Sequence, residues 1–137
     1  MTMGDDFPWV QKRSECSLGK VFELLRQQVA QDVQVRQNVR QSVSDIGGRP
    51  NYNHSFTITE ARDSFTVMLE GNQLHERVSF LLEPHSIKVS GTNGELMFEA
   101  YPSLNADGQC IVKVDRREYP LWYMRMLALE KLFFGII

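Results

Sequence analysis

The spacing of apolar residues changes from a helical to a strand period at Gly47-Gly48-Arg49-Pro50. Before this break, apolar residues recur every three to four positions, which is the period of an amphipathic α-helix. After it, they alternate with polar residues, which is the period of a half-buried β-strand. Because glycine and proline both favour the end of a helix, the break predicts a helix followed by a sheet, and the fold class is α+β.

The N-terminal helix is predicted to span residues 17–46, after a poorly ordered lead-in over residues 1–16. About 30 helical residues extend about 45 Å, whereas the ~90 residues after them form a body with a radius of gyration of ~12 Å. We therefore expect the far end of the helix to be covered by another chain, most simply a second copy. The six glutamines from Gln27 to Gln41 form either a solvated polar face or the polar flank of a coiled coil.

Residues 53–115 are predicted to form an antiparallel meander of about six short strands with one solvated face. The segment Thr92-Asn93-Gly94-Glu95 is expected to be a type I′ hairpin turn, because Asn-Gly supplies two positive φ angles. The pattern allows either an open sheet or a closed sandwich. A short C-terminal amphipathic helix is predicted over residues 119–134. Because apolar residues lie on most of its sides, we expect it to be buried on more than one side.

Composition limits the classes of protein that fit. The chain has 137 residues, 42% of them hydrophobic, which is enough for one core. The formal net charge is -2 and the pI is about 5.9, which argues against nucleic acid as a partner. The first residues lack the apolar region of a signal peptide, and no apolar run reaches the ~20 residues of a membrane span. We expect a cytoplasmic protein without a membrane partner.

The sequence carries no motif that predicts catalysis, a metal site or a cofactor. His54, His75 and His85 are not at metal-ligand spacing. Cys16 and Cys110 are expected to be reduced, with Cys110 a buried thiol on a strand. The small basic and aromatic cluster Arg116-Arg117, with Lys113 and Tyr119 nearby, is interpreted as a solvated lead-in to the last helix. These observations favour a protein that is not an enzyme.

One part of the sheet region resembles a known family. Residues 63–91 contain the strand FTVMLE, the break GNQLHE, the strand RVSFLLE and the strand SIKVSG. This order is similar to part of the α-crystallin domain of small heat-shock proteins. The resemblance implies a β-sandwich, oligomerisation and holdase-type binding of unfolded chains.

Three functional hypotheses follow. The first is a non-enzymatic domain that self-associates as a homodimer through its helices, using Leu18, Phe22, Leu25, Val29, Val39, Val43, Phe133 and Phe134. The second is the small heat-shock-like holdase. The third is a small-ligand carrier or enzyme whose cavity, between the sheet and the C-terminal helix, is lined by Phe56, Phe65, Phe80, Phe98, Trp122 and Met126.

Overall fold

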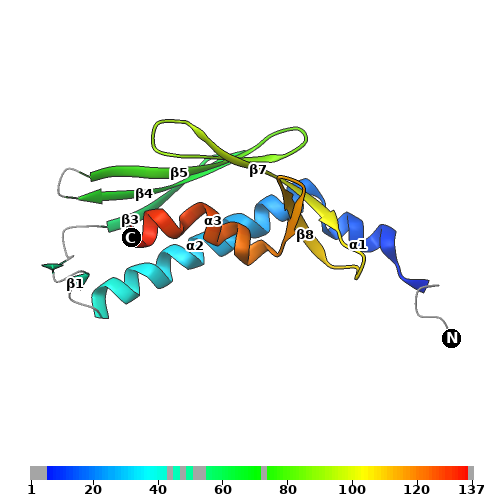
Figure 1. Ribbon diagram of the computed structural model, residues 1–137, viewed down its shortest axis with the longest axis horizontal. Coiled ribbons are helices and arrows are strands. Elements are labelled where there is room, and N and C mark those ends of the chain that lie inside the picture. Colours follow the sequence, from blue (N-terminus) through cyan, green and yellow to red (C-terminus); the bar gives the residue numbers. More distant parts are fainter. Residues whose placement is uncertain (1–5, 43–44, 47–48, 51–54, 72–73, 136–137) are drawn as a thin grey trace.

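The computed structural model describes residues 6–42, 45–46, 49–50, 55–71 and 74–135 (Figure 1). A short helix, α1 (Trp9–Glu15), precedes the long helix α2 (Leu18–Ser42), and α3 (Leu121–Phe134) follows the strands. The predicted α+β class, with a strand meander between an N-terminal and a C-terminal helix, is confirmed. Residues 9–15, which the sequence assigned to an irregular lead-in, are helical instead.

Within the described residues, seven consecutive strands form one antiparallel sheet in chain order. They are β3 (Ser55–Glu60), β4 (Ser64–Gly71), β5 (Leu74–Leu82), β6 (Ile87–Ser90), β7 (Leu96–Leu104), β8 (Cys110–Val114) and β9 (Arg117–Tyr119). Two short strands between α2 and this sheet, β1 (Asp45–Ile46) and β2 (Arg49–Pro50), pair only with each other in the described residues. The large sheet is single and open at β3 and β9, so the β-sandwich implied by the resemblance to small heat-shock proteins is not the fold seen here.

The core lies between this sheet and the two longer helices, which Figure 1 shows on the same side of β3, β4 and β5. On β4, Phe65, Val67 and Leu69 are buried while their neighbours are half-buried, as expected for a strand covered on one face. Helix α2 reaches this face through Phe22, whose ring centroid lies 5.2 Å from that of Phe65. The Phe65 ring stacks in turn on Phe80, at 4.6 Å. The first half of the apolar stripe of α2 is therefore core.

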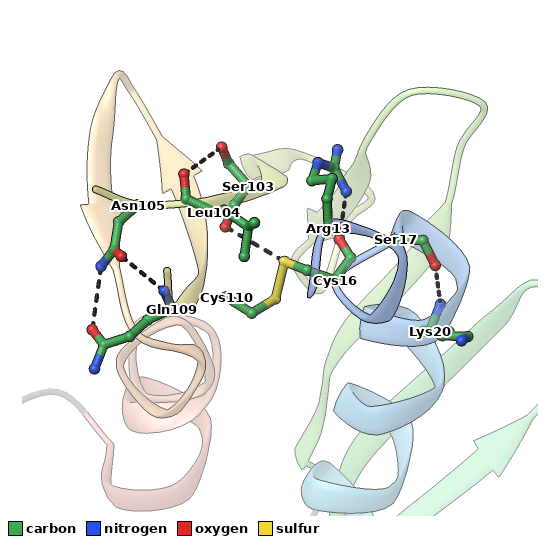
Figure 2. Close-up of a disulfide and its surroundings, with 9 residues drawn as sticks. All are labelled: Arg13, Cys16, Ser17, Lys20, Ser103, Leu104, Asn105, Gln109 and Cys110. Atoms are coloured by element: carbon green, nitrogen blue, oxygen red, sulfur yellow. Dashed lines mark hydrogen bonds between the residues drawn. A yellow bond between two sulfur atoms is a disulfide. The ribbon is translucent and has the colours of Figure 1, made fainter. Parts of the chain in front are cut away.

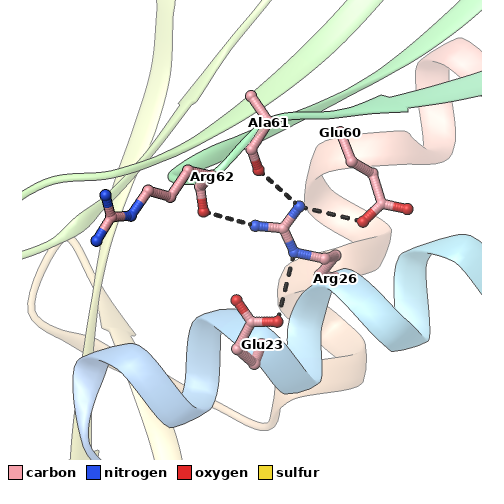
Figure 3. Close-up of polar contacts among 5 residues, drawn as sticks. All are labelled: Glu23, Arg26, Glu60, Ala61 and Arg62. Atoms are coloured by element: carbon pink, nitrogen blue, oxygen red, sulfur yellow. Dashed lines mark hydrogen bonds and ion pairs between the residues drawn. The ribbon is translucent and has the colours of Figure 1, made fainter.

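A single arginine fastens α2 to the turn between β3 and β4 (Figure 3). Arg26 Nη1 donates hydrogen bonds to Glu60 Oε1 and to the carbonyl of Ala61, at 3.1 and 2.9 Å. Its Nη2 donates to the carbonyl of Arg62, at 3.0 Å, and its Nε lies 3.5 Å from Glu23 Oε1. The guanidinium also lies over the rings of Phe22 and Phe65. Arg26 thus fixes the helix against the start of the sheet.

The turn at residues 91–95 differs from its prediction, and the turn between β8 and β9 was not predicted. At residues 91–95, Gly94 has a positive φ of 82° but Asn93 does not, and the Gly94 N–H donates to the Gly91 carbonyl at 3.0 Å. This geometry is a type I turn followed by a glycine bulge, so the prediction of a type I′ turn is wrong. Two consecutive positive φ angles occur instead at Asp115 and Arg116, between β8 and β9.

A disulfide joins Cys16, between α1 and α2, to Cys110 at the start of β8 (Figure 2). The prediction that both cysteines are reduced is therefore wrong, as is the description of Cys110 as a buried thiol, since that residue is exposed and Cys16 is the buried partner. The two lie 94 residues apart in sequence. Their pairing depends on the path of the whole sheet, which brings the beginning of β8 to the corner between α1 and α2.

Candidate functional site

Helices α2 and α3 pack together and leave a groove of ≈390 Å³ between them. Helix α2 contributes its second half to this groove, and α3 contributes one face along nearly its whole length. The lining residues are Asp32, Val35, Arg36, Val39, Trp122, Arg125, Met126, Leu129, Glu130, Phe133 and Phe134.

Four apolar side chains on this groove are strongly exposed, and we call them the α2–α3 patch. They are Val35 at 55%, Val39 at 44%, Trp122 at 57% and Phe134 at 55% exposure. Folded monomers rarely expose large apolar side chains as a contiguous group, and such groups mark interaction or ligand sites. The α2–α3 patch is therefore the candidate functional surface.

The groove is held in shape by Arg125, which reaches from α3 to α2. Its Nε donates to Asp32 Oδ2 at 2.7 Å, and its Nη1 donates to Gln28 Oε1 at 2.6 Å. The Arg125 and Asp32 side chains are only 19% and 30% exposed, so water screens this ion pair less than a pair at an open surface. The pair fixes the distance between the two helices and neutralises both charges.

A second arginine links the helices in the opposite direction, from α2 to the last turn of α3. Arg36 is buried, and its Nε donates to the carbonyl of Phe133 at 2.8 Å. Its guanidinium also lies 5.1 Å from the ring centroids of both Phe56 and Phe134. A cation at the C-terminal end of a helix is favourable because the carbonyl groups there carry partial negative charge. Arg36 and Arg125 together make the groove a rigid, preformed surface.

The residues predicted to form an interface fall into two groups. Phe22, Leu25 and Val29 are fully buried in the chain's own core, and Leu18 is partly buried against it. The other members lie on or near the groove, where Val39 and Phe134 are exposed and Phe133 is buried beneath them. Val43 lies outside the described residues. Only the far half of the stripe can therefore contact another folded chain.

The residues predicted to line a cavity are also divided. Phe56, Phe65 and Phe80 are buried in the core, and Phe98 packs against it. Phe65 stacks on Phe80, and the ring centroid of Phe56 lies 5.1 Å from that of Phe133, so these side chains fill space between the sheet and the helices. Trp122 and Met126 instead line the α2–α3 groove.

A second cleft, of ≈610 Å³, lies where the C-terminal end of α3 faces β5 and the β6–β7 hairpin. It contains none of the aromatic residues predicted to line a cavity. Its polar residues include acids and bases, namely Glu76, Arg77, Glu95 and Lys131. The Glu95 carboxylate already accepts the N–H of Asn93 at 2.8 Å. This mixed set has no arrangement typical of a catalytic or metal site.

In the part of the chain that the structure describes, the histidines and the basic residues outside the groove do not form a second candidate site. His75 and His85 are exposed, and His54 lies outside the described residues. Arg116 and Arg117 are exposed around the β8–β9 turn. Across these same residues, no group of His, Cys, Asp or Glu side chains could hold a metal ion, and no described helix has the length and apolar character needed to cross a membrane.

Known proteins offer no template for this surface. No protein-family model, curated protein or solved structure matches the chain. The groove between α2 and α3 must therefore be interpreted from its own chemistry.

Proposed function

We propose that this chain is an interaction domain that self-associates as a two-fold homodimer through the α2–α3 patch. The observation that carries the proposal is the exposure of Val35, Val39, Trp122 and Phe134 along one preformed groove. A two-fold axis brings the same surface of two copies together, as in most homodimers. In such a dimer, α2 and α3 of both copies form a four-helix layer between two sheets.

The charges of the groove favour a second copy over a charged partner. Two acids, Asp32 and Glu130, and two bases, Arg36 and Arg125, line it, so neither sign is in excess. Arg125 and Asp32 are already paired with each other, and Arg36 is engaged with α3. An apolar surface with balanced charge favours a partner whose surface is also apolar and balanced in charge. A second copy of the chain has such a surface.

Trp122 is the natural anchor of this interface. It is the largest exposed side chain of the α2–α3 patch and stands at the beginning of α3, whereas Phe134 stands at the end of that helix. An antiparallel two-fold arrangement places Trp122 of each copy at the Phe134 end of the partner's groove. Tryptophan is strongly enriched among the residues that dominate binding energy at interfaces.

The proposal is tested by the mass of the full chain in solution, measured by size-exclusion chromatography with light scattering over a range of concentrations. We expect twice the chain mass of 15.8 kDa. Trp122→Ala should weaken the dimer by roughly thirty-fold, equivalent to about 2 kcal/mol. The matched control is Trp9→Ala, because Trp9 on α1 is 64% exposed and far from the groove in sequence. A monomeric full chain, or equal effects of the two substitutions, contradicts the proposal.

A small apolar ligand is the second candidate occupant, because ≈390 Å³ lies within the size range of ligand sites. Tryptophan emission separates the two cases in a Trp9→Phe variant, where Trp122 is the remaining tryptophan. In a dimer, the emission shifts to shorter wavelength as protein concentration rises. If the chain stays monomeric and the shift requires an added long-chain fatty acid, the groove is a ligand site and the dimer is wrong.

We also propose an oxidising compartment for the functional protein, because disulfides persist mainly there. The expectation of a cytoplasmic location came from the lack of a signal-peptide pattern and of an apolar run long enough for a membrane span, whereas Cys16 and Cys110 are bonded to each other. Free thiols in the protein isolated from its own cells without added reductant would contradict this location.

A further inference from the structure

Helix α1 is attached to the molecule without contributing to its core. No residue of Trp9–Glu15 is buried, and Trp9 and Val10 are 64% and 60% exposed. Contacts at both ends join it to the β7–β8 hairpin. Before the helix, the Phe7 ring lies directly against Gly108, and after the helix, Cys16 is bonded to Cys110. The disulfide is thus the covalent attachment of a helix that has little packing of its own.

The two cysteines differ in their access to solvent. Cys16 is 0% exposed, whereas Cys110 belongs to the exposed residues at the start of β8. A thiolate in solution must reach a disulfide sulfur to attack it. Cys110 Sγ is therefore the point of attack, and Cys16 is the leaving thiol.

The position of Cys16 already suits its reduced form. Its Sγ lies 3.4 Å from the carbonyl oxygen of Ser103 on β7 (Figure 2). In the disulfide this sulfur carries no hydrogen, so the contact is not a hydrogen bond. Once reduced, the thiol can donate its S–H to that carbonyl. The buried thiol then has a polar partner without any movement of β7, which removes one cost of reduction.

From these contacts we propose that Cys16–Cys110 is a redox-sensitive latch, which releases α1 from the β7–β8 hairpin when a dithiol reduces it. One thiolate of the dithiol attacks Cys110 Sγ, the S–S bond breaks, and Cys16 Sγ leaves with the electron pair and takes up a proton. The second thiolate of the dithiol then attacks the mixed disulfide and releases Cys110. Two electrons and two protons pass to the protein, and the dithiol becomes a disulfide.

The remaining fold does not depend on α1. The core joins α2, the inner face of the sheet and α3, and it includes no residue of Trp9–Glu15. Arg26 and Arg125 hold α2 to the β3–β4 turn and to α3 independently of the disulfide. Reduction therefore frees one end of the molecule and leaves the α2–α3 patch in place, so this latch does not rest on the proposed dimer.

Hydrogen exchange of backbone amides in the full chain tests the latch, with and without dithiothreitol. Reduction should speed exchange in Trp9–Glu15 by about tenfold or more, to nearly the rate of an unstructured peptide, while α2 and β4 remain protected. The double variant Cys16→Ser with Cys110→Ser is the control and should show fast exchange in α1 under both conditions. Unchanged exchange in α1 would overturn the latch. Loss of protection throughout α2 and the sheet would overturn it too, because the bond would then hold the whole fold.

The order of attack is tested by single variants and a chromogenic disulfide reagent. Cys16→Ser leaves the exposed Cys110, which should react about tenfold faster than the buried Cys16 left by Cys110→Ser. Circular dichroism of both variants shows whether the fold is kept. If both are folded and their thiols react at the same rate, the assignment of Cys110 as the attacked sulfur is wrong.

Discussion

Arg26 joins helix α2 to the β3–β4 turn by contacts that need a planar guanidinium. Two of its nitrogens donate to three acceptors, including the backbone carbonyls of Ala61 and Arg62. Its side chain is only 12% exposed. A lysine ammonium carries its three donors on one nitrogen and cannot reproduce this fork. The turn is therefore held by the shape of this side chain as well as by its charge.

We expect Arg26→Lys to lower the free energy of unfolding by about 2 kcal/mol, because at least one turn carbonyl loses its partner. Urea unfolding followed by circular dichroism measures the change. Arg62→Lys is the matched control, because the Arg62 side chain is exposed and only its carbonyl enters the cluster. That control should stay within about 0.5 kcal/mol of the parent. A tolerated Arg26→Lys would show that charge alone suffices.

At the scale of elements, the connection between β8 and β9 carries backbone strain. Arg116 has a φ of 68°, next to Asp115 with a φ of 52°. Aspartate tolerates this left-handed region because its short side chain can bond locally, but arginine has no such compensation. The two-residue turn therefore has a geometry that glycine at its second position would suit better.

Arg116→Gly should raise the free energy of unfolding by about 0.5 kcal/mol, since relief of left-handed strain slightly exceeds the added entropy of the unfolded chain. Arg117→Gly is the matched control. Arg117 is the first residue of β9 and lacks a positive φ, so glycine there should lower stability. Thermal unfolding of both variants gives the comparison, and a destabilising Arg116→Gly would contradict the strain.

The order of elements was predictable because it depends on local periodicity. The change of period at Gly47-Gly48-Arg49-Pro50 correctly separates α2 from the seven-stranded sheet, although α2 ends at Ser42 and Asp45–Ile46 of the predicted helix form β1 instead. The division of α2 into a half buried in the core and a half exposed on the groove was harder to predict from the sequence. The stripe splits around Asp32 and Arg36, and the sequence does not say which half the sheet covers. Val35 lies beside that stripe, so its exposure on the groove depends on where α3 packs.

At the scale of the whole molecule, the disulfide was the main feature that the sequence could not reveal. Two cysteines 94 residues apart show no pairing signal, because their proximity results from the complete meander. Arg36 and Arg125 were missed for the same reason. Their partners, Phe133 and Asp32, lie more than 90 residues away on the opposite helix. Contacts of long sequence separation define the groove, and local patterns carry no trace of them.

Closing so long a loop should contribute greatly to stability. In the chain-entropy description, a loop of this size is worth about 4.5 kcal/mol. We expect dithiothreitol to lower the free energy of unfolding in urea by a few kcal/mol while the chain remains folded in buffer. The double variant Cys16→Ser with Cys110→Ser should have the same free energy of unfolding as the reduced protein, and dithiothreitol should not change it. A reduced chain as stable as the oxidised one would indicate that the unfolded state already holds these segments together.

The same bond determines how the chain responds to tension. When the two ends are pulled, the sulfur bridge carries the load past everything between Cys16 and Cys110, including α2 and strands β3–β7. Helix α3 and strand β9 lie outside that shielded ring and bear the force directly. Breaking the bond would add about 330 Å of extensible length. A stretched molecule would therefore lose α3, and with it the surface proposed for pairing, while its longest helix is still protected.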